Sequence, residues 1–189
     1  MKKGVLITAT ILLIILFSNA FTVRLDGLSA ALANPLVPND STLVDQVDYS
    51  WCSLYILETD KGPITAISNK VIGILWKSTT SISYYSHDDP VKTLGGANWS
   101  SRGREATVFS VQVEDDNVSY IEVGSLDSRK RKEAVIGEPI TFSWDKEIPF
   151  NELDAKALND KGEILYEYRN SKIHHSSENI RWYSVEADN

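Results

Sequence analysis

Alternation of apolar and polar residues is the feature of this sequence that most restricts its fold. Segments 106–113, 140–144 and 164–168 carry mainly apolar or aromatic residues at every second position, whereas helical periodicity is poor after residue 34. Successive side chains of a strand point to opposite sides of a sheet, so a period of two predicts half-buried strands. The β-branched and aromatic residues of these segments favour the same structure.

Turn-forming residues separate the strand candidates at short intervals. Segments 60–63, 115–117 and 159–162 combine Asp, Asn, Gly and Pro, which favour tight turns. The sequence therefore predicts an all-β fold, a sandwich or open barrel of about 8–10 short, mainly antiparallel strands. A short helix over 150–156 is weighed as an alternative for that segment alone.

A hydrophobic segment precedes this β region. Lys2 and Lys3 stand before an apolar run over residues 4–17, which resumes after two polar residues and ends at Arg24. A positive start followed by an apolar stretch resembles a secretory signal. The preferred interpretation is a retained N-terminal hydrophobic helix, because the 20 residues 4–23, at about 1.5 Å each, span a hydrocarbon core of about 30 Å.

The alternative is a signal peptide that is removed, with cleavage after residue 20 or residue 33. Both interpretations place the rest of the chain outside the cytoplasm. The preferred location is the cell membrane, as a single-pass protein with its C-terminal domain outside, and the alternative is secretion. The sequence thus divides into a signal-anchor or signal-peptide segment at 1–23, a linker at 24–45 and an exported β domain at 46–189.

Charge and cysteine content exclude several classes of function. The chain has 19 Lys and Arg against 26 Asp and Glu, for a net charge of −7, so no nucleic-acid partner is expected. The single cysteine, Cys52, excludes an intramolecular disulfide and any multi-cysteine metal site. No nucleophile elbow, phosphate-binding loop, dinucleotide fingerprint or zinc-protease motif occurs. No catalytic residue and no cofactor are therefore predicted.

The segment 94–104 is the best candidate for a ligand-binding loop. Its glycines would let a backbone approach a ligand, Trp99 could stack on a sugar or peptide, and Arg102 or Arg104 could bind an anion. The competing interpretation is a simple connector with Trp99 folded into the core. The other four tryptophans lie in strand patterns and are expected in the core: Trp51, Trp76, Trp144 and Trp182.

Four consecutive cations form the sharpest charge feature in this acidic chain: Arg129, Lys130, Arg131 and Lys132. They fall between two strand candidates, so an exposed loop is predicted. One interpretation is contact with an anionic surface, either lipid headgroups or an anionic polymer. The other is a solubilising loop whose charges pair with neighbouring carboxylates.

Two histidine-containing clusters and one acidic run were weighed as metal sites: His174-His175 with Glu178, His87-Asp88-Asp89, and residues 114–117. None has the spacing of a zinc site or of an EF-hand loop. Polar turn residues are the preferred interpretation for all three, and no metal site is predicted.

Taken together, these features predict a membrane-anchored or secreted extracytoplasmic domain, in a bacterial cell envelope, that acts by binding rather than catalysis. Its expected partners are the membrane, through the N-terminal segment, and an envelope protein or an anionic polymer. The alternative is an envelope hydrolase that uses spatially paired carboxylates or a histidine with an acid partner.

Overall fold

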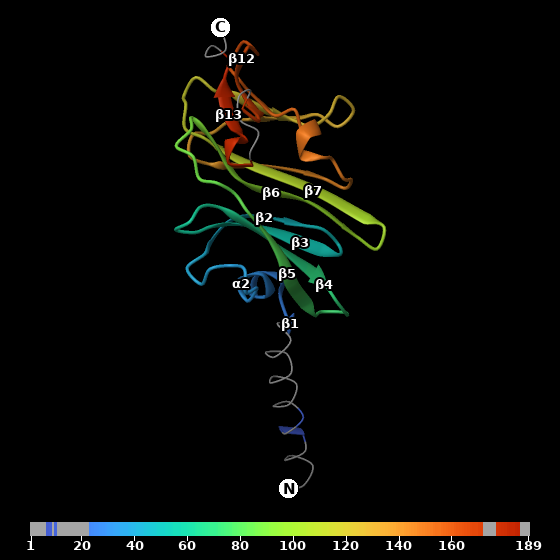
Figure 1. Ribbon diagram of the computed structural model, residues 1–189. Coiled ribbons are helices and arrows are strands. Elements are labelled where there is room, and N and C mark those ends of the chain that lie inside the picture. The colour runs from blue at the N-terminus through green and yellow to red at the C-terminus, as the bar shows by residue number, and fades with distance from the viewer. Residues whose placement is uncertain (1–6, 9, 11–22, 172–176, 186–189) are drawn as a thin grey trace.

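Three β-sheets stacked in layers make up the folded part of the chain (Figure 1). The computed structural model describes residues 7, 8, 10, 23–171 and 177–185, and these contain thirteen strands whose pairings are antiparallel. The predicted all-β, mainly antiparallel architecture of the sandwich type is thus confirmed. The predicted N-terminal hydrophobic helix falls almost wholly outside the described residues. In the part of the chain that is described, no helix combines the length and the apolar character needed to cross a membrane.

Sheet A is the lowest layer in Figure 1 and has the strand order β1-β5-β4-β3-β2. Its strands pair mostly between sequence neighbours, as a meander in which each turn is short. The strands are β1 (Val23–Arg24), β2 (Thr42–Asp48), β3 (Cys52–Glu58), β4 (Ile64–Lys70) and β5 (Trp76–Ser83).

Sheet B forms the middle layer and has the order β10-β7-β6. Its strands are β6 (Val91–Ser101), β7 (Arg104–Val113) and β10 (Pro139–Trp144). The alternation predicted in 106–113 is present in β7, but both of its faces are buried. Ala106 and Val108 pack on sheet A, whereas Phe109 and Val111 join the cluster shared with sheet C. The middle position of sheet B explains why β7 has little polar surface.

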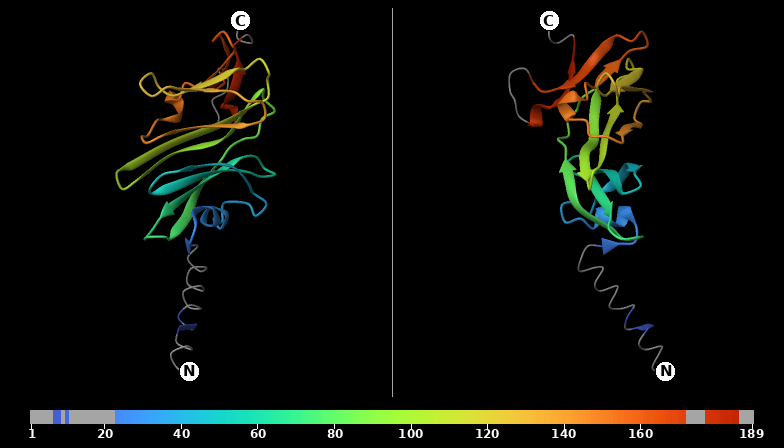
Figure 2. Two further views of the ribbon diagram at one scale, coloured as in Figure 1. Left: turned by 180° about the vertical axis from the view of Figure 1, so that it is seen from behind. Right: turned by 90° about the vertical axis from the view of Figure 1, so that its right-hand side faces the viewer.

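Sheet C is the third layer, on the side of sheet B away from sheet A (Figures 1 and 2). Its order is β13-β12-β11-β8-β9. The strands are β8 (Tyr120–Val123), β9 (Lys130–Glu133), β11 (Lys156–Leu158), β12 (Ile164–Arg169) and β13 (Arg181–Ser184). Two 3-10 helices, η1 (Phe150–Glu152) and η2 (Ser177–Asn179), lie in the connections. The single turn of η1 stands where a short helix over 150–156 was weighed.

The helix α2 (Gly27–Leu32) covers the outer face of sheet A. The Asp26 carboxylate caps it by accepting a hydrogen bond from the Ser29 N–H at 2.7 Å. Ala31 packs with Tyr55 and Leu57 of β3. Residues 24–45, expected as a linker, therefore contribute a helix, the start of β2 and buried side chains. The physical reason lies in β3, which is buried on both faces and needs a cover on the side away from sheet B.

Candidate functional site

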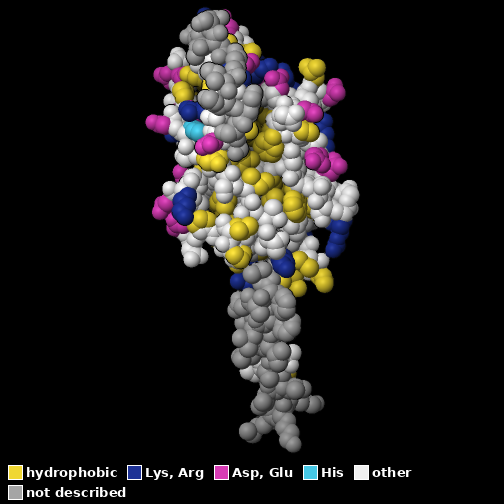
Figure 3. All heavy atoms as spheres, viewed as in Figure 1, with side chains coloured by type: hydrophobic (Ala, Val, Ile, Leu, Met, Phe, Trp, Pro, Cys, Tyr) yellow, Lys and Arg dark blue, Asp and Glu magenta, His cyan; other side chains and the backbone are white. Residues whose placement is uncertain are grey.

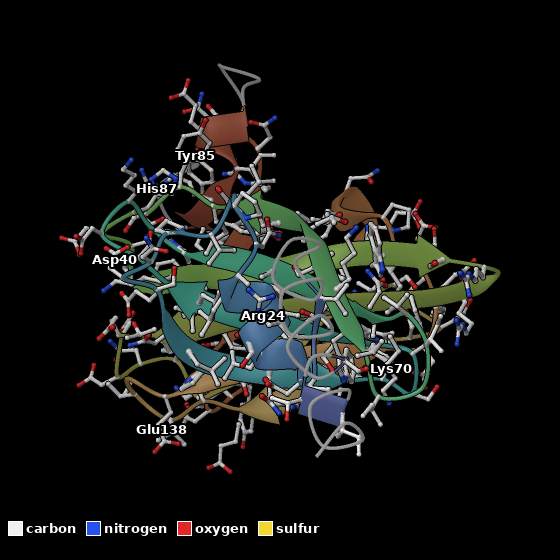
Figure 4. All side chains as sticks on the ribbon, turned by 90° about the horizontal axis from the view of Figure 1, so that it is seen from below. Arg24, Asp40, Lys70, Tyr85, His87 and Glu138 are labelled. Carbon is white, nitrogen blue, oxygen red and sulfur yellow. The ribbon has the colours of Figure 1, made fainter. Side chains whose placement is uncertain are left out.

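The three sheets enclose a cleft of about 380 Å³ along one side of the stack. Its walls come from the β3–β4 turn, the segment after β5, the first residues of β6, and strands β12 and β13. Figure 4 labels His87 and Tyr85 at this side of the molecule. A volume of this size is typical of sites for small ligands or for a few residues of a partner.

Aromatic side chains form the floor of the cleft. Tyr168 lies between Trp182, at 5.6 Å between ring centroids, and Phe109, at 5.1 Å. The Trp182 Nε1–H donates to Thr93 Oγ1 at 3.3 Å, and the Tyr84 hydroxyl donates to the Gly96 carbonyl at 3.1 Å. Burial raises the pKa of Tyr168 to about 12 and moves the pKa of Tyr84 further in the same direction. Both phenols therefore stay protonated at neutral pH and act as hydrogen-bond donors.

A bulge in β6 shapes one wall of the cleft. The register of β6 against β7 shifts between Thr93 and Gly95, and both Thr93 and the intervening Leu94 line the cleft. Gly95 has a φ of 153°, and a Cβ there would collide with Thr65 of sheet A. The Gly96 N–H donates to Thr65 Oγ1 at 2.9 Å. These glycines serve the close approach of sheets A and B, and the bulge redirects the neighbouring side chains.

An ion pair closes the cleft on the side of sheet C. Two guanidinium nitrogens of Arg181 in β13 donate to the carboxylate of Asp89, Nε to Oδ2 at 3.0 Å and Nη2 to Oδ1. Asp89 is only 6% exposed, so the pair satisfies a carboxylate that has little access to water. Donating these hydrogen bonds to Asp89 raises the pKa of Arg181. This pair fixes β13 to the segment that leads into β6.

His87 is the unsatisfied polar group of the cleft. Its Nε2 atom is buried and, among the described residues, has no hydrogen-bond partner. Buried polar atoms are nearly always hydrogen-bonded, and His87 lines the cleft, so its imidazole is the candidate group for a ligand to satisfy. The neighbouring Asp89 does not fill this role, because its carboxylate is occupied by Arg181.

The charges that line the cleft balance one another. The basic side chains are Lys61, Lys92 and Arg181, and the acidic ones are Glu58, Asp60 and Asp89. Lys92 also pairs with Glu114 at 3.3 Å, beyond the cleft. Such a lining favours a polar, uncharged ligand group over a polyanion.

The predicted ligand-binding residues lie at the other end of β6 from the cleft. Their segment is not a loop, because β6 continues to Ser101 and a tight turn follows at Arg102 and Gly103, with φ values of 53° and 74°. The Trp99 Nε1–H donates to Asn69 Oδ1 at 2.9 Å, and its ring packs against the cluster between sheets A and B. The Arg104 guanidinium lies 5.1 Å from the centroid of the Trp51 ring.

The basic run also forms a strand rather than the predicted loop. Lys130, Arg131 and Lys132 lie in β9, at the exposed edge of sheet C. Lys130 donates to the Ser143 carbonyl and Lys132 to the Thr141 carbonyl, the latter at 2.6 Å, so both cover the open edge of β10.

The arginines of the run pair with carboxylates instead. Arg131 lies 3.5 Å from Glu122 and stacks 3.8 Å from the Tyr120 ring centroid, while Arg129 pairs with Asp154. Contact with an anionic surface remains a prediction for these four residues. Sheet B separates them from β1, where the described domain begins.

Two of the three clusters weighed as metal sites, His87-Asp88-Asp89 and residues 114–117, lie within the described residues. Within the described ranges, no group of three His, Cys, Asp or Glu side chains could hold an ion. His174 and His175 lie outside those ranges. Asp115 of the acidic run accepts hydrogen bonds from the Asn117 N–H and the Tyr166 hydroxyl, which lower its pKa. Burial raises the pKa of Cys52 to about 12, so its thiol is a packing group at neutral pH.

Comparison with protein families, with curated proteins and with solved structures gives no match. The cleft is therefore interpreted from its own geometry. Sequence reasoning weighed His87 as a possible metal ligand, preferred a polar turn for its segment, and did not single out Arg181 or Tyr168. The signal that could have drawn attention to this region is the Gly95-Gly96 pair inside a strand pattern, since glycine in a strand often marks a bulge.

Proposed function

We propose that this chain is an extracytoplasmic binding domain, held at the membrane by its N-terminal apolar segment, and that the cleft beside His87 is its ligand site. The observation that carries the proposal is His87, a residue of the cleft lining whose Nε2 atom is buried and lacks a partner among the described residues. A ligand that supplies one hydrogen-bonding group would satisfy it.

The ligand that fits best is a peptide segment of another envelope protein. Peptide amides offer hydrogen-bonding groups without net charge, which suits the balanced lining of the cleft. Its volume accommodates one or two side chains, so the partner would insert a short segment rather than a whole domain. An anionic polymer fits less well, because Arg181 is already neutralised by Asp89.

The cleft geometry gives less support to the hydrolase alternative. General-base catalysis by a histidine needs an orienting partner on one ring nitrogen and a nucleophile or water at the other. No hydrogen bond joins His87 to a carboxylate in the described structure, and Asp89 is engaged by Arg181. Binding is therefore the function we propose.

Photo-crosslinking in the native cells tests this proposal. A photoreactive residue is placed at Lys61, which is exposed and lines the cleft, and in a second protein at Arg102, in the β6–β7 turn. We expect an adduct with an envelope protein from position 61, reduced about tenfold by His87→Ala through loss of one hydrogen bond. Arg104→Ala is the matched control and should leave the adduct unchanged. Adducts only from position 102, or no effect of His87→Ala, would contradict the proposal.

A further inference from the structure

The β4–β5 hairpin ends in an apolar tip that is exposed to solvent. Ile72 is 74% exposed, Ile74 is 71% exposed, and Val71 beside them is also exposed. The turn is closed by hydrogen bonds of 2.9 Å from the Val71 N–H to the Leu75 carbonyl and from the Leu75 N–H to the Ile72 carbonyl. Gly73 has a φ of 57°, as a tight hairpin turn requires. The tip is therefore a fixed projection, and its isoleucines contribute little to the core.

The chain enters the folded domain directly beside this tip. β1 pairs with β5, so that Val23 lies opposite Lys77 and Arg24 opposite Trp76. Leu25, the next residue, is 70% exposed and extends the apolar surface. In the sequence, Val23 is the last residue of the apolar run that begins at Gly4. The end of a segment long enough to span a bilayer thus coincides with the base of an exposed apolar hairpin.

Basic and aromatic side chains surround the tip in an otherwise acidic protein. Lys70 and Lys77 flank it on β4 and β5, and Arg24 lies on β1. The Lys70 Nζ lies 4.9 Å from the centroid of the half-buried Trp76 ring. Figure 3 shows hydrophobic side chains gathered at this foot of the molecule beside Lys and Arg side chains. Apolar residues with adjacent Trp and Lys or Arg are typical of surfaces that sit in the interface of a bilayer.

We propose that the β4–β5 tip, residues 71–75 together with Leu25, inserts into the outer surface of a phospholipid membrane as a second contact beside the N-terminal segment. The proposal rests on the membrane location given under Proposed function. Lipid is the expected partner because the apolar run ends at Val23, and the cations Arg24, Lys70 and Lys77 lie at the same surface. The cations would contact anionic headgroups while the isoleucines enter the apolar region.

This contact would fix the orientation of the whole domain. The tip and the cleft lie at opposite ends of β4 and β5, since Lys70 ends β4 at the tip and Pro63, before its first residue, lines the cleft. Figure 4 shows Lys70 and His87 on opposite sides of the molecule. Seven residues of strand cover about 23 Å, so an inserted tip would lie about that far from the cleft along the strand.

Depth measurements on the full chain in vesicles of phosphatidylcholine and phosphatidylglycerol test the inference. A fluorescent label is attached to Ile72→Cys, and in a separate protein to Leu126→Cys, which is 89% exposed between β8 and β9 of sheet C. The native Cys52 is buried and stays unlabelled. We expect the label at 72 to be about fivefold less accessible to an aqueous quencher than the label at 126, and to be quenched by brominated lipid chains.

Equal aqueous quenching of the two labels in vesicle-bound protein would overturn the inference and leave the membrane location intact. Shielding at 72 that depends on protein concentration and not on lipid bromination would also overturn it, in favour of a second copy of the chain. Protein that does not float with the vesicles would contradict both the membrane location and the tip contact.

Discussion

The two ends of the β4–β5 hairpin differ in which side chains are buried. At the cleft end, polar groups such as Asp89, Thr93 and Tyr84 lie in buried or half-buried positions, and nearly all of them have partners. At the tip end, Ile72 and Ile74 are largely exposed to solvent and make few contacts with the rest of the protein. The same two strands therefore connect a polar interior to an apolar projection.

This difference shows two features that do not stabilise the isolated fold, an unpartnered buried polar atom and exposed apolar side chains. A polar atom buried without a partner, such as His87 Nε2, destabilises the fold unless something binds it. An exposed isoleucine contributes little stability and promotes association. Both are departures from ordinary burial, and in this protein they lie at opposite ends of one hairpin. The comparison therefore points to a ligand at one end and to lipid at the other.

Truncating an isoleucine at each end should give the largest contrast. Ile64 begins β4 at the cleft end and is 4% exposed, so Ile64→Ala should lower the free energy of unfolding by about 3 kcal/mol. Ile74→Ala at the tip should change it by less than about 0.5 kcal/mol. Urea denaturation in a common detergent measures both. Similar losses for the two variants would end the distinction between a packed end and a projecting end.

Breaking the ion pair at the cleft should have the next largest effect. Arg181→Ala leaves the Asp89 carboxylate nearly buried without its partner, and we expect a loss of about 2 kcal/mol, since Arg181 is partly exposed. The double variant Asp89→Ala/Arg181→Ala removes both charges and should lose less than the single variant. The same denaturation experiment measures the difference. A double variant that is less stable than Arg181→Ala would contradict the view that the unpaired Asp89 charge causes the loss of stability.

The two turn glycines offer a finer comparison between the ends. Gly62 has a φ of 110°, and a Cβ there would lie 3.0 Å from the Tyr84 carbonyl oxygen, whereas a Cβ at Gly73 would meet no atom within 4 Å. Both positions disfavour an L side chain, so Gly73→Ala should cost about 1 kcal/mol and Gly62→Ala about 1.5 kcal/mol. Thermal unfolding of the two variants gives the order. A larger loss for Gly73→Ala would mean that the tip is the more constrained turn.

An effect similar in size to that of Gly73→Ala is expected at the cap of α2, next to the tip. Hydrogen bonds from Ser29 lower the pKa of Asp26, so this carboxylate stabilises the fold at pH values above its unfolded pKa of about 3.9. That contribution is lost as the pH falls through the lower folded pKa. Asp26→Ala should cost about 1 kcal/mol at pH 7 and should flatten the acid side of the stability curve. An unchanged acid limb in denaturation between pH 2 and about pH 6 would contradict this role.

Period-two alternation predicted the fold class because it reports the local pleat of each strand. Trp51, Trp144 and Trp182 are buried as predicted, whereas Trp76 is only half-buried beside the tip. Alternation cannot show how many sheets stack on one another. For that reason it did not reveal that β7 is covered on both sides, or that α2 is needed over β3.

The candidate site was less accessible to sequence reasoning, for a physical reason. Its walls join residues as far apart as Thr59, Thr93 and Trp182, which meet only when the sheets stack. The segment 94–104 drew attention through its glycines, but Gly95 and Gly96 serve the contact with Thr65 of sheet A. The sequence indicates that these glycines permit a close approach to the backbone. Only the tertiary structure shows that the group in contact is Thr65 rather than a ligand.

The most direct test of the membrane-anchored binding domain is the intact mass of the protein in fractions of its native cells, with protease added from outside. Our account predicts that the protein retains residues 4–23, occurs in the membrane fraction and loses its β domain to the external protease. A protein that begins near Phe21 or Asn34 in a soluble exported fraction, or a β domain protected from the protease, would contradict it.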